Sequence, residues 1–227
     1  MSVATIGMVV LTVFLGNWQH RRAEEKRVLA KEFDVRSSGS ILSLPVSKAN
    51  AGDLAFHRVS VRGRFDAAKS FFLDNKVHAG RVGYHVITPF RISSSPLYVL
   101  VDRGWVPAGP TRDVLPLLAT PEGERTIEGI AAVPSARFIE LAPDRGGAVR
   151  QNLVIARIES EARIELQPIV LEQTSDAADG LVRHWDRPDT GIERHIAYSL
   201  QWYSLAALAA VLYVLLNFRR SAGSGQR

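Results

Sequence analysis

Two stretches of the 227-residue chain contain no Asp, Glu, Lys or Arg: residues 1–18 and residues 196–218. The second stretch has 23 residues. As a helix it would be about 34 Å long, which exceeds the roughly 30 Å of a bilayer's hydrocarbon core. The first stretch is at the short end of the spanning range. The pattern predicts two transmembrane helices, one on each side of a long polar segment.

The first stretch could instead be a secretory signal peptide. No basic residue precedes its apolar run, however, and no small-x-small cleavage site follows it. Signal peptides usually have both features, so a membrane anchor is favoured. The missing basic flank also suggests that the natural chain starts a few residues earlier.

The segment between these stretches, residues 19–195, reads as one β-rich domain. Residues 19–36 are rich in helix formers and are expected to extend the first helix. After a predicted loop, alternating or β-branched runs predict strands, and one amphipathic run predicts a helix. The strands are expected at 57–65, 70–73, 84–92, 97–106, 125–133 and 169–174, and the helix at 152–166. The predicted fold class is therefore an α+β membrane protein with a small antiparallel sheet or barrel-like domain.

Charge suggests how the chain is oriented. Arg219, Arg220 and Arg227 form a short tail without acids at residues 219–227, and such tails stay in the cytoplasm. Because two spans bring both termini to one side, residues 19–195 are predicted to be extracytoplasmic. The tail also supplies three of the five net positive charges, so nucleic-acid binding has little support and membrane lipids are the expected surroundings.

Composition and motifs do not support catalysis. The chain has no cysteine, which excludes disulfides, thiolate metal sites and cysteine nucleophiles. It has no His-Glu-x-x-His, Gly-x-Ser-x-Gly or Walker motif. The segment from Gly80 to Gly83 reads as a turn between strands. We therefore expect a protein that is not an enzyme. A membrane-tethered enzyme would need an ordered polar cluster in a pocket of the β domain.

Two of the six histidines lie where the helices are expected to leave the membrane. They are His20 and His195, and a neutral imidazole at this level could ligate the metal of a porphyrin. A polar residue at the membrane boundary is the simpler alternative. The other four are expected on the surface or hydrogen-bonded in the core: His57, His78, His85 and His184.

Aromatic residues accompany His195. Helical spacing puts Tyr198 and Trp202 on its face, and Trp18 and Gln19 are expected at the same depth. Such residues ordinarily form an aromatic belt at the membrane surface, but they would also suit a flat apolar macrocycle. Candidate donors to its propionates are, by position, Arg21, Arg22 and Arg194.

Five blocks, in order along the chain, resemble the Surfeit-locus cytochrome c oxidase assembly protein family. The opening block is Gly16-x-Trp18-Gln19-x-x-Arg22-x-x-x-Lys26-x-x-Leu29. The central blocks are Gly63-Arg-Phe65, then Gly83-Tyr84 with Thr88-Pro89, then Val101-Asp-Arg103-Gly104-Trp105-Val-Pro107. The closing block is His195-x-x-Tyr198-x-x-x-Trp202-Tyr203. Ser199 departs from the family's Ala, and His20 from its usual apolar residue.

The resemblance implies an inner-membrane assembly factor for haem-copper oxidases. It would bind haem a and help its delivery to the catalytic subunit, together with other assembly factors. His195 would be the haem-associated residue and the metal ligand. Tyr198, Trp202, Trp18 and Gln19 are the further cofactor-binding candidates. A bacterial cell membrane is favoured because no mitochondrial presequence is visible. The alternative is a membrane-anchored scaffold for oxidase subunits that binds no haem. For Arg103-Gly104-Trp105 a structural role is favoured.

Overall fold

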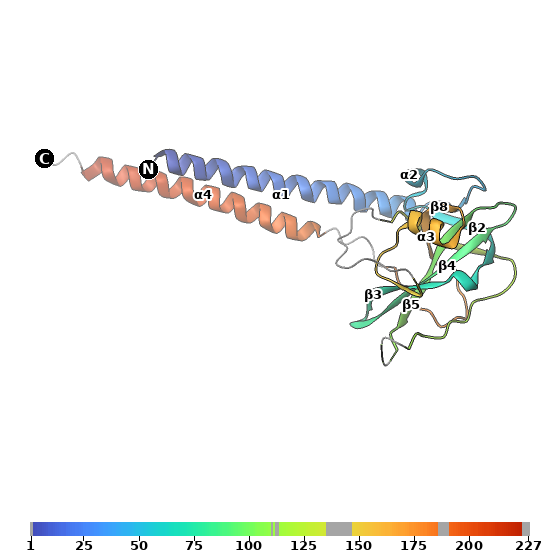
Figure 1. The fold of residues 1–227 in the computed structure, drawn as a ribbon. Coiled ribbons are helices and arrows are strands. Elements are labelled where there is room, and N and C mark those ends of the chain that lie inside the picture. Colours follow the sequence, from blue (N-terminus) through green and yellow to red (C-terminus); the bar gives the residue numbers. More distant parts are fainter. Residues whose placement is uncertain (1, 110, 112–113, 135–146, 186–190, 224–227) are drawn as a thin grey trace. The chain divides into compact units, whose positions relative to one another are not determined.

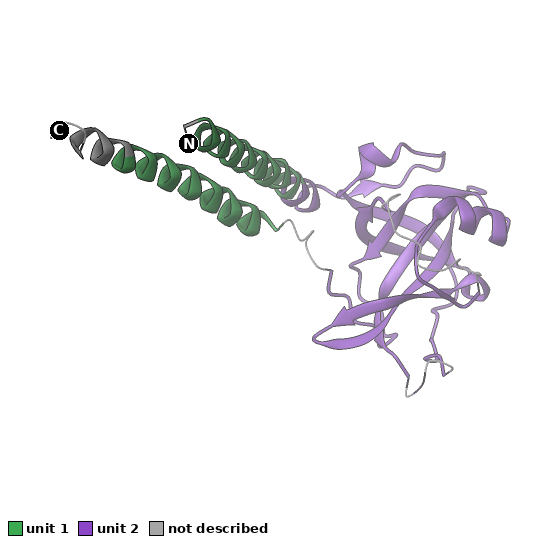
Figure 2. Cartoon of the chain, turned by 60° about the vertical axis from the view of Figure 1, so that its left-hand side comes forward, with its two compact units in different colours: residues 1–32, 187–227 green, residues 33–186 purple. Residues whose placement is uncertain are grey.

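The computed structural model describes residues 2–109, 111, 114–134, 147–185 and 191–223. The chain forms two compact units, residues 1–32 with 187–227 and residues 33–186 (Figure 2). The first unit contains most of a long helix pair, and the second contains the sheet.

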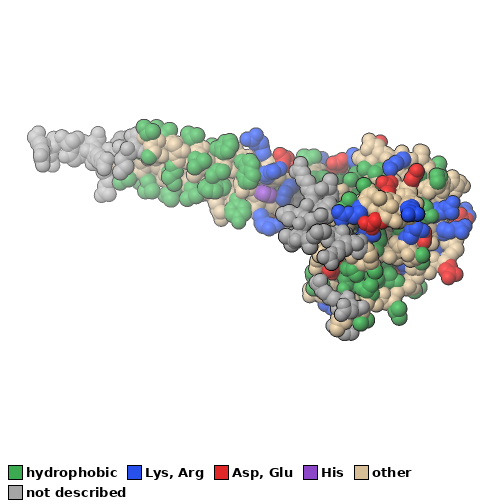
Figure 3. Space-filling view, in the orientation of Figure 1, with side chains coloured by type: hydrophobic (Ala, Val, Ile, Leu, Met, Phe, Trp, Pro, Cys, Tyr) green, Lys and Arg blue, Asp and Glu red, His purple; other side chains and the backbone are tan. Residues whose placement is uncertain are grey.

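The helix pair consists of α1 (Ser2–Ser37) and α4 (Ile192–Gly223). Both helices are long and apolar enough to cross a membrane, and most of their large hydrophobic side chains are exposed (Figure 3). A helix in the core of a soluble protein would bury these side chains, so their exposure supports membrane spans. As predicted, α1 continues without a break through residues 19–36. The second helix begins four residues before the predicted position 196.

The second unit is built on an eight-stranded sheet in the order β1-β2-β6-β8-β5-β4-β3-β7, with an additional β2–β4 pairing (Figure 1). The strands are β1 (Leu42–Ser43), β2 (Arg58–Phe65), β3 (Phe71–His78), β4 (Arg81–Ile92), β5 (Tyr98–Pro107), β6 (Arg125–Ala132), β7 (Val149–Arg150) and β8 (Leu166–Gln173). The β2–β4 pairing closes β2, β6, β8, β5 and β4 into a five-stranded barrel. All neighbours in this ring are antiparallel except β5 and β8. The predicted barrel-like domain is therefore confirmed.

The barrel encloses the main hydrophobic core. Each of its five strands contributes two core residues: Val59 and Val61, Phe90 and Ile92, Val99 and Val101, Ile127 and Ala131, Ile169 and Leu171. Successive side chains point to opposite faces of a strand, so the residues between them form the outer face. A second cluster lies on that face, where β3 and α3 (Ile155–Ala162) pack over Leu100 and Val170.

Several boundaries differ from the predictions. The strand predicted at 70–73 continues to His78 through a bulge, where Asn75 takes φ +59° and the register shifts between Leu73 and Lys76. The predicted helix over 152–166 is shorter, since Arg163 takes a left-handed conformation and β8 begins at Leu166. Four short elements were missed within or between predicted segments: β1, β7, the one-turn helix α2 (Ala51–Leu54) and the 3-10 helix η1 (Ala67–Lys69).

Candidate functional site

The helix pair brings His195 and Gln19 together. The Nδ1 atom of His195 lies 2.6 Å from the amide oxygen Oε1 of Gln19. With the amide oxygen of Gln19 as the acceptor, Nδ1 is the donor, and the Nδ1–H tautomer has its lone pair on Nε2. A histidine that ligates a metal through one ring nitrogen usually donates a hydrogen bond from the other ring nitrogen to a second residue. The half-buried His195 is therefore pre-oriented for ligation.

Further contacts hold the two helices in register next to this pair. The hydroxyl of Ser199 donates to the carbonyl of Gly16 at 3.1 Å, and the hydroxyl of Tyr203 donates to the side chain of Asn17 at 2.7 Å. A Cβ atom at Gly16 would lie only 2.6 Å from the ring of Tyr203. Small residues let helices approach closely in a membrane, and Ser199 serves that purpose where the family's Ala was expected.

The other predicted site residues are distributed around the pair. Trp202 is half-buried, whereas Trp18 and Tyr198 are 44% and 51% exposed. His20 is exposed, and of the candidate propionate donors Arg22 forms an ion pair with Glu25 at 2.9 Å. Arg21 and Arg194 are also exposed. The haem-contact roles of His195, Gln19, Trp18, Tyr198 and Trp202 stay predictions.

A second polar group lies on the outer face of the barrel. The carboxylate of Asp102 on β5 is 2.7 Å from Nδ1 of His85 on β4. Glu172 on β8 is the direct register partner of Asp102, and the side chain of Asp102 is only 9% exposed. His85 and Glu172 border a cavity of about 200 Å³, which is lined by Lys76, Val77, His78, His85, Trp105, Glu172, His184 and Trp185.

Burial changes the protonation of the two acids. It raises the pKa of Asp102, against the opposing effect of the hydrogen bond from His85. Burial and then the charge of Asp102 raise the pKa of Glu172 to about 7. Two carboxyl groups side by side out of water cannot both ionise easily. The pair therefore tends to keep a proton near neutral pH.

This pocket is an ordered polar cluster of the kind that a membrane-tethered enzyme would need in its β domain. Its imidazole–carboxylate pair is an arrangement used in proton transfer. No hydroxyl or thiol nucleophile occurs among its described lining residues, and the described residues contain no group of three or more side chains suited to hold a metal ion. The geometry supports proton exchange and binding of a small molecule, without a nucleophile for covalent catalysis.

The sequence contains no motif that marks this pocket. Its residues come from four strands and the segment after β8, and only the sheet register brings them together. The sequence does give a partial signal for this pocket. Asp102 and Glu172 are charged residues within otherwise apolar strands, and each lies two positions after an apolar residue of the outer face, Leu100 or Val170. The expectation that His85 is a hydrogen-bonded histidine is correct.

Arg103 has the structural role that was expected. Its side chain is fully buried and forms an ion pair with Asp179 at 2.9 Å, and Asp179 also pairs with Arg183 at 2.7 Å. The neighbour Gly104 takes φ +136°, and a Cβ there would lie 2.7 Å from the carbonyl oxygen of Val182. This segment thus ties β5 to the chain that follows β8.

We expect Glu172→Gln to remove a pH dependence of stability. In the folded protein Glu172 keeps its proton up to about pH 7, whereas an unfolded glutamate loses it near its ordinary value of 4.5. The folded state binds more protons in this window, so the free energy of unfolding falls as pH rises from 4.5 to 7. Above pH 7 the glutamine variant should be more stable by on the order of 2 kcal/mol.

Urea unfolding at pH 4.5 and pH 8 measures this difference. Glu128→Gln is a suitable control, because Glu128 is on β6 with its side chain 42% exposed and pairs with Arg58. The control should lose at most about 1 kcal/mol. Equal stability of Glu172→Gln and the unmodified protein at pH 8 would show that Glu172 carries no buried charge.

The fold and the helix contacts define a class of protein: a small closed β barrel flanked by two candidate membrane-spanning helices that share a histidine-centred contact. Comparison with known families identifies the family. The SURF1 family model matches residues 6–207, and the chain belongs to the SURF1 family.

Relatives match over most of their length. A SURF1-like protein of Monosiga brevicollis is 24% identical over 99% of this chain and 90% of the relative. Surfeit locus protein 1 of Mus musculus is 28% identical over 94% of this chain and 75% of the relative. A SURF1-like protein of Rickettsia felis is 26% identical over 94% of this chain and 96% of the relative. The resemblance noted in the sequence blocks is confirmed at the level of the family.

Proposed function

We propose that this protein is an assembly factor for cytochrome c oxidase that binds haem a through His195 and helps its delivery to the catalytic subunit. Membership of the SURF1 family supports the role in oxidase assembly. The observation that carries the haem proposal is the 2.6 Å contact between His195 Nδ1 and Gln19 Oε1. It leaves Nε2 as the acceptor atom of a neutral, oriented imidazole.

The residues around His195 fit a haem cargo. No hydrogen bond joins Nε2 to a residue in the described part of the chain. Trp18 and Tyr198 are exposed on the same helices and offer aromatic surface to an apolar macrocycle. Gln19 is engaged by His195, so we assign it the role of positioning the imidazole. His195 itself would ligate the iron of the bound haem.

The location we propose is a bacterial cell membrane. The chain would pass through the membrane twice, with the barrel on the extracytoplasmic side. Two exposed apolar helices and the basic tail Arg219, Arg220 and Arg227 support this orientation, and the Rickettsia felis relative is bacterial. The partners would be the oxidase catalytic subunit and other assembly factors.

We expect protein purified in detergent from cells that make haem a to show a Soret band, and His195→Ala to lose most of it. Gln19→Leu should weaken haem binding about tenfold, because the loss of a ring-orienting partner costs about that much in metal sites. His20→Ala serves as a matched control, since His20 is exposed on α1 next to Gln19. It should keep the full band.

The same experiment distinguishes the haem-binding proposal from the scaffold alternative. A colourless unmodified protein would overturn the haem proposal. Co-purification of an oxidase subunit that persists in His195→Ala would then support a membrane-anchored scaffold. Absence of any oxidase subunit, together with normal oxidase levels in cells that lack the protein, would overturn the assembly role.

A further inference from the structure

Two arginines on neighbouring strands face one another, and neither forms an ion pair with an acid among the described residues. Arg64 on β2 and Arg91 on β4 are direct partners in the register that closes the barrel. Both side chains are exposed, and neither guanidinium group forms an ion pair or hydrogen bond with a residue in the described part of the chain. Like charges placed directly opposite destabilise a sheet. A bound anion would remove that repulsion.

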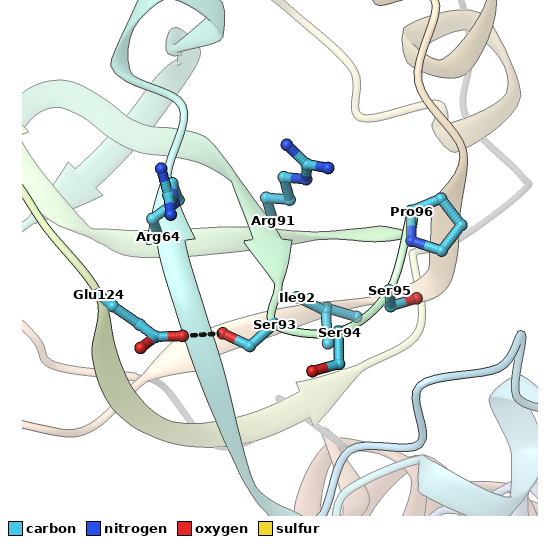
Figure 4. A pocket seen from close by; sticks show the side chains of 8 residues that line it. All are labelled: Arg64, Arg91, Ile92, Ser93, Ser94, Ser95, Pro96 and Glu124. Carbon is cyan, nitrogen blue, oxygen red and sulfur yellow. Dashed lines mark hydrogen bonds between the residues drawn. The ribbon is translucent and has the colours of Figure 1, made fainter.

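The carboxylate nearest to this pair is already engaged. Glu124 accepts a hydrogen bond from the hydroxyl of Ser93 (Figure 4). It accepts another from Nη2 of Arg62 at 2.9 Å. These two contacts hold the pKa of Glu124 below its ordinary value, and the charge of Arg64 acts on it only as a smaller contribution. Glu124 thus bonds directly to Arg62 and balances the charge of Arg64 only in part, so the two arginines keep a net positive charge within the described pocket.

The two arginines line a hollow with further donors. The pocket has a volume of about 520 Å³ and is lined by Arg64, Arg91, Ile92, Ser93, Ser94, Ser95, Pro96 and Glu124. Figure 4 shows the guanidinium groups of Arg64 and Arg91 rising from adjacent strands on the same side. The turn that follows β4 forms the rim of this pocket, and Ser94 takes φ +62° at the point where the chain reverses.

We propose that the Arg64–Arg91 pocket binds a ligand that carries a phosphate monoester group. The two guanidinium groups carry two positive charges, and a phosphate monoester carries about −1.5 to −2 at pH 7. A carboxylate would neutralise only one of them. The planar donor fork of arginine also matches the several acceptor oxygens of phosphate. This inference is independent of the proposed function, because the pocket lies wholly within the barrel unit.

Isothermal titration of the full chain in neutral detergent tests the site, with inorganic phosphate and acetate compared at equal ionic strength. We expect saturable phosphate binding that Arg64→Gln and Arg91→Gln each weaken about tenfold, the usual loss for a charged hydrogen-bonding partner. Arg58→Gln is the matched control, an arginine on the same strand that pairs with Glu128 at 3.6 Å. It should bind phosphate normally.

Thermal unfolding gives an independent readout at low ionic strength. Without phosphate, Arg91→Gln should unfold at a higher temperature than the unmodified protein, because the repulsion is gone, and phosphate should no longer stabilise it. Binding of inorganic phosphate in neutral micelles indicates a soluble ligand. Binding seen only with phosphatidic acid in the micelles, and lost in both variants, indicates a lipid headgroup. Acetate binding as tight as phosphate, or phosphate binding that neither variant weakens, would overturn the proposal.

Discussion

Arg103→Met is expected to destabilise the barrel unit by about 3–5 kcal/mol, because it removes one of the two arginines that balance a buried carboxylate and leaves further buried acceptors without a donor. The side chains of Arg103 and Asp179 are 0% and 1% exposed. Arg103 also donates to the hydroxyl of Thr120 at 2.9 Å and to the carbonyl of Ala119 at 2.6 Å. The methionine fills similar space but supplies none of these donors. Arg183 alone would remain to balance Asp179.

The measurement is urea unfolding of the full chain in detergent, followed by tryptophan fluorescence. Arg58→Met is the matched control, because its ion pair with Glu128 has side chains that are 41% and 42% exposed. Exposed pairs contribute at most about 1 kcal/mol. The double variant Arg103→Met with Asp179→Leu should recover little of the loss, since Arg183, whose side chain is 11% exposed, then lacks its acidic partner. If Arg103→Met costs no more than the control, the buried pair is not a source of stability.

Gly63→Ala is expected to prevent closure of the barrel, at a cost of about 4 kcal/mol or more. A Cβ atom at Gly63 would lie 2.0 Å from the carbonyl oxygen of Arg91. That oxygen belongs to the backbone of β4, so it cannot move aside as a flexible side chain could. Gly63 pairs with β6 on one side and with β4 on the other, at the position where the ring closes. Even a methyl group there would separate β2 from β4.

Gly52→Ala is the matched control for this substitution. Gly52 lies in α2, and a Cβ there would be 3.6 Å from the nearest side-chain atom, Oδ1 of Asn50. Far-ultraviolet circular dichroism and urea unfolding should show a normal β signal in the control and a weakened, non-cooperative one in Gly63→Ala. Equal stability of the two variants would show that the close approach of β2 and β4 is not needed for the fold.

Local pattern was sufficient for most elements of this chain. Alternation with β-branched residues located the six longer strands, and charge-free runs located the two long helices. The errors concern features that depend on neighbouring strands. Asn75 looked like a turn residue, but β3 continues through it because its partner β4 extends beyond it. Two-residue strands such as β1 have no periodicity to detect.

The candidate site at the helix pair was predicted only in part. The position of His195 at the end of an apolar run, together with the family resemblance, singled it out. The sequence also placed Gln19 at the same depth. Its direct contact with His195, however, depends on the close antiparallel packing of the two helices, which the small residues Gly16 and Ser199 allow. The hydrogen bond that orients the imidazole is therefore a tertiary feature.

By itself, the sequence determined the two charge-free helices, the β-rich domain between them and the family, because periodicity and ordered motifs are properties of local runs of residues. Only the tertiary structure decided which side chains meet. The Asp102–Glu172 pair and the Arg64–Arg91 pair join residues that are 70 and 27 positions apart. The register of a closed barrel sets both pairs, and register arises from packing of the whole core.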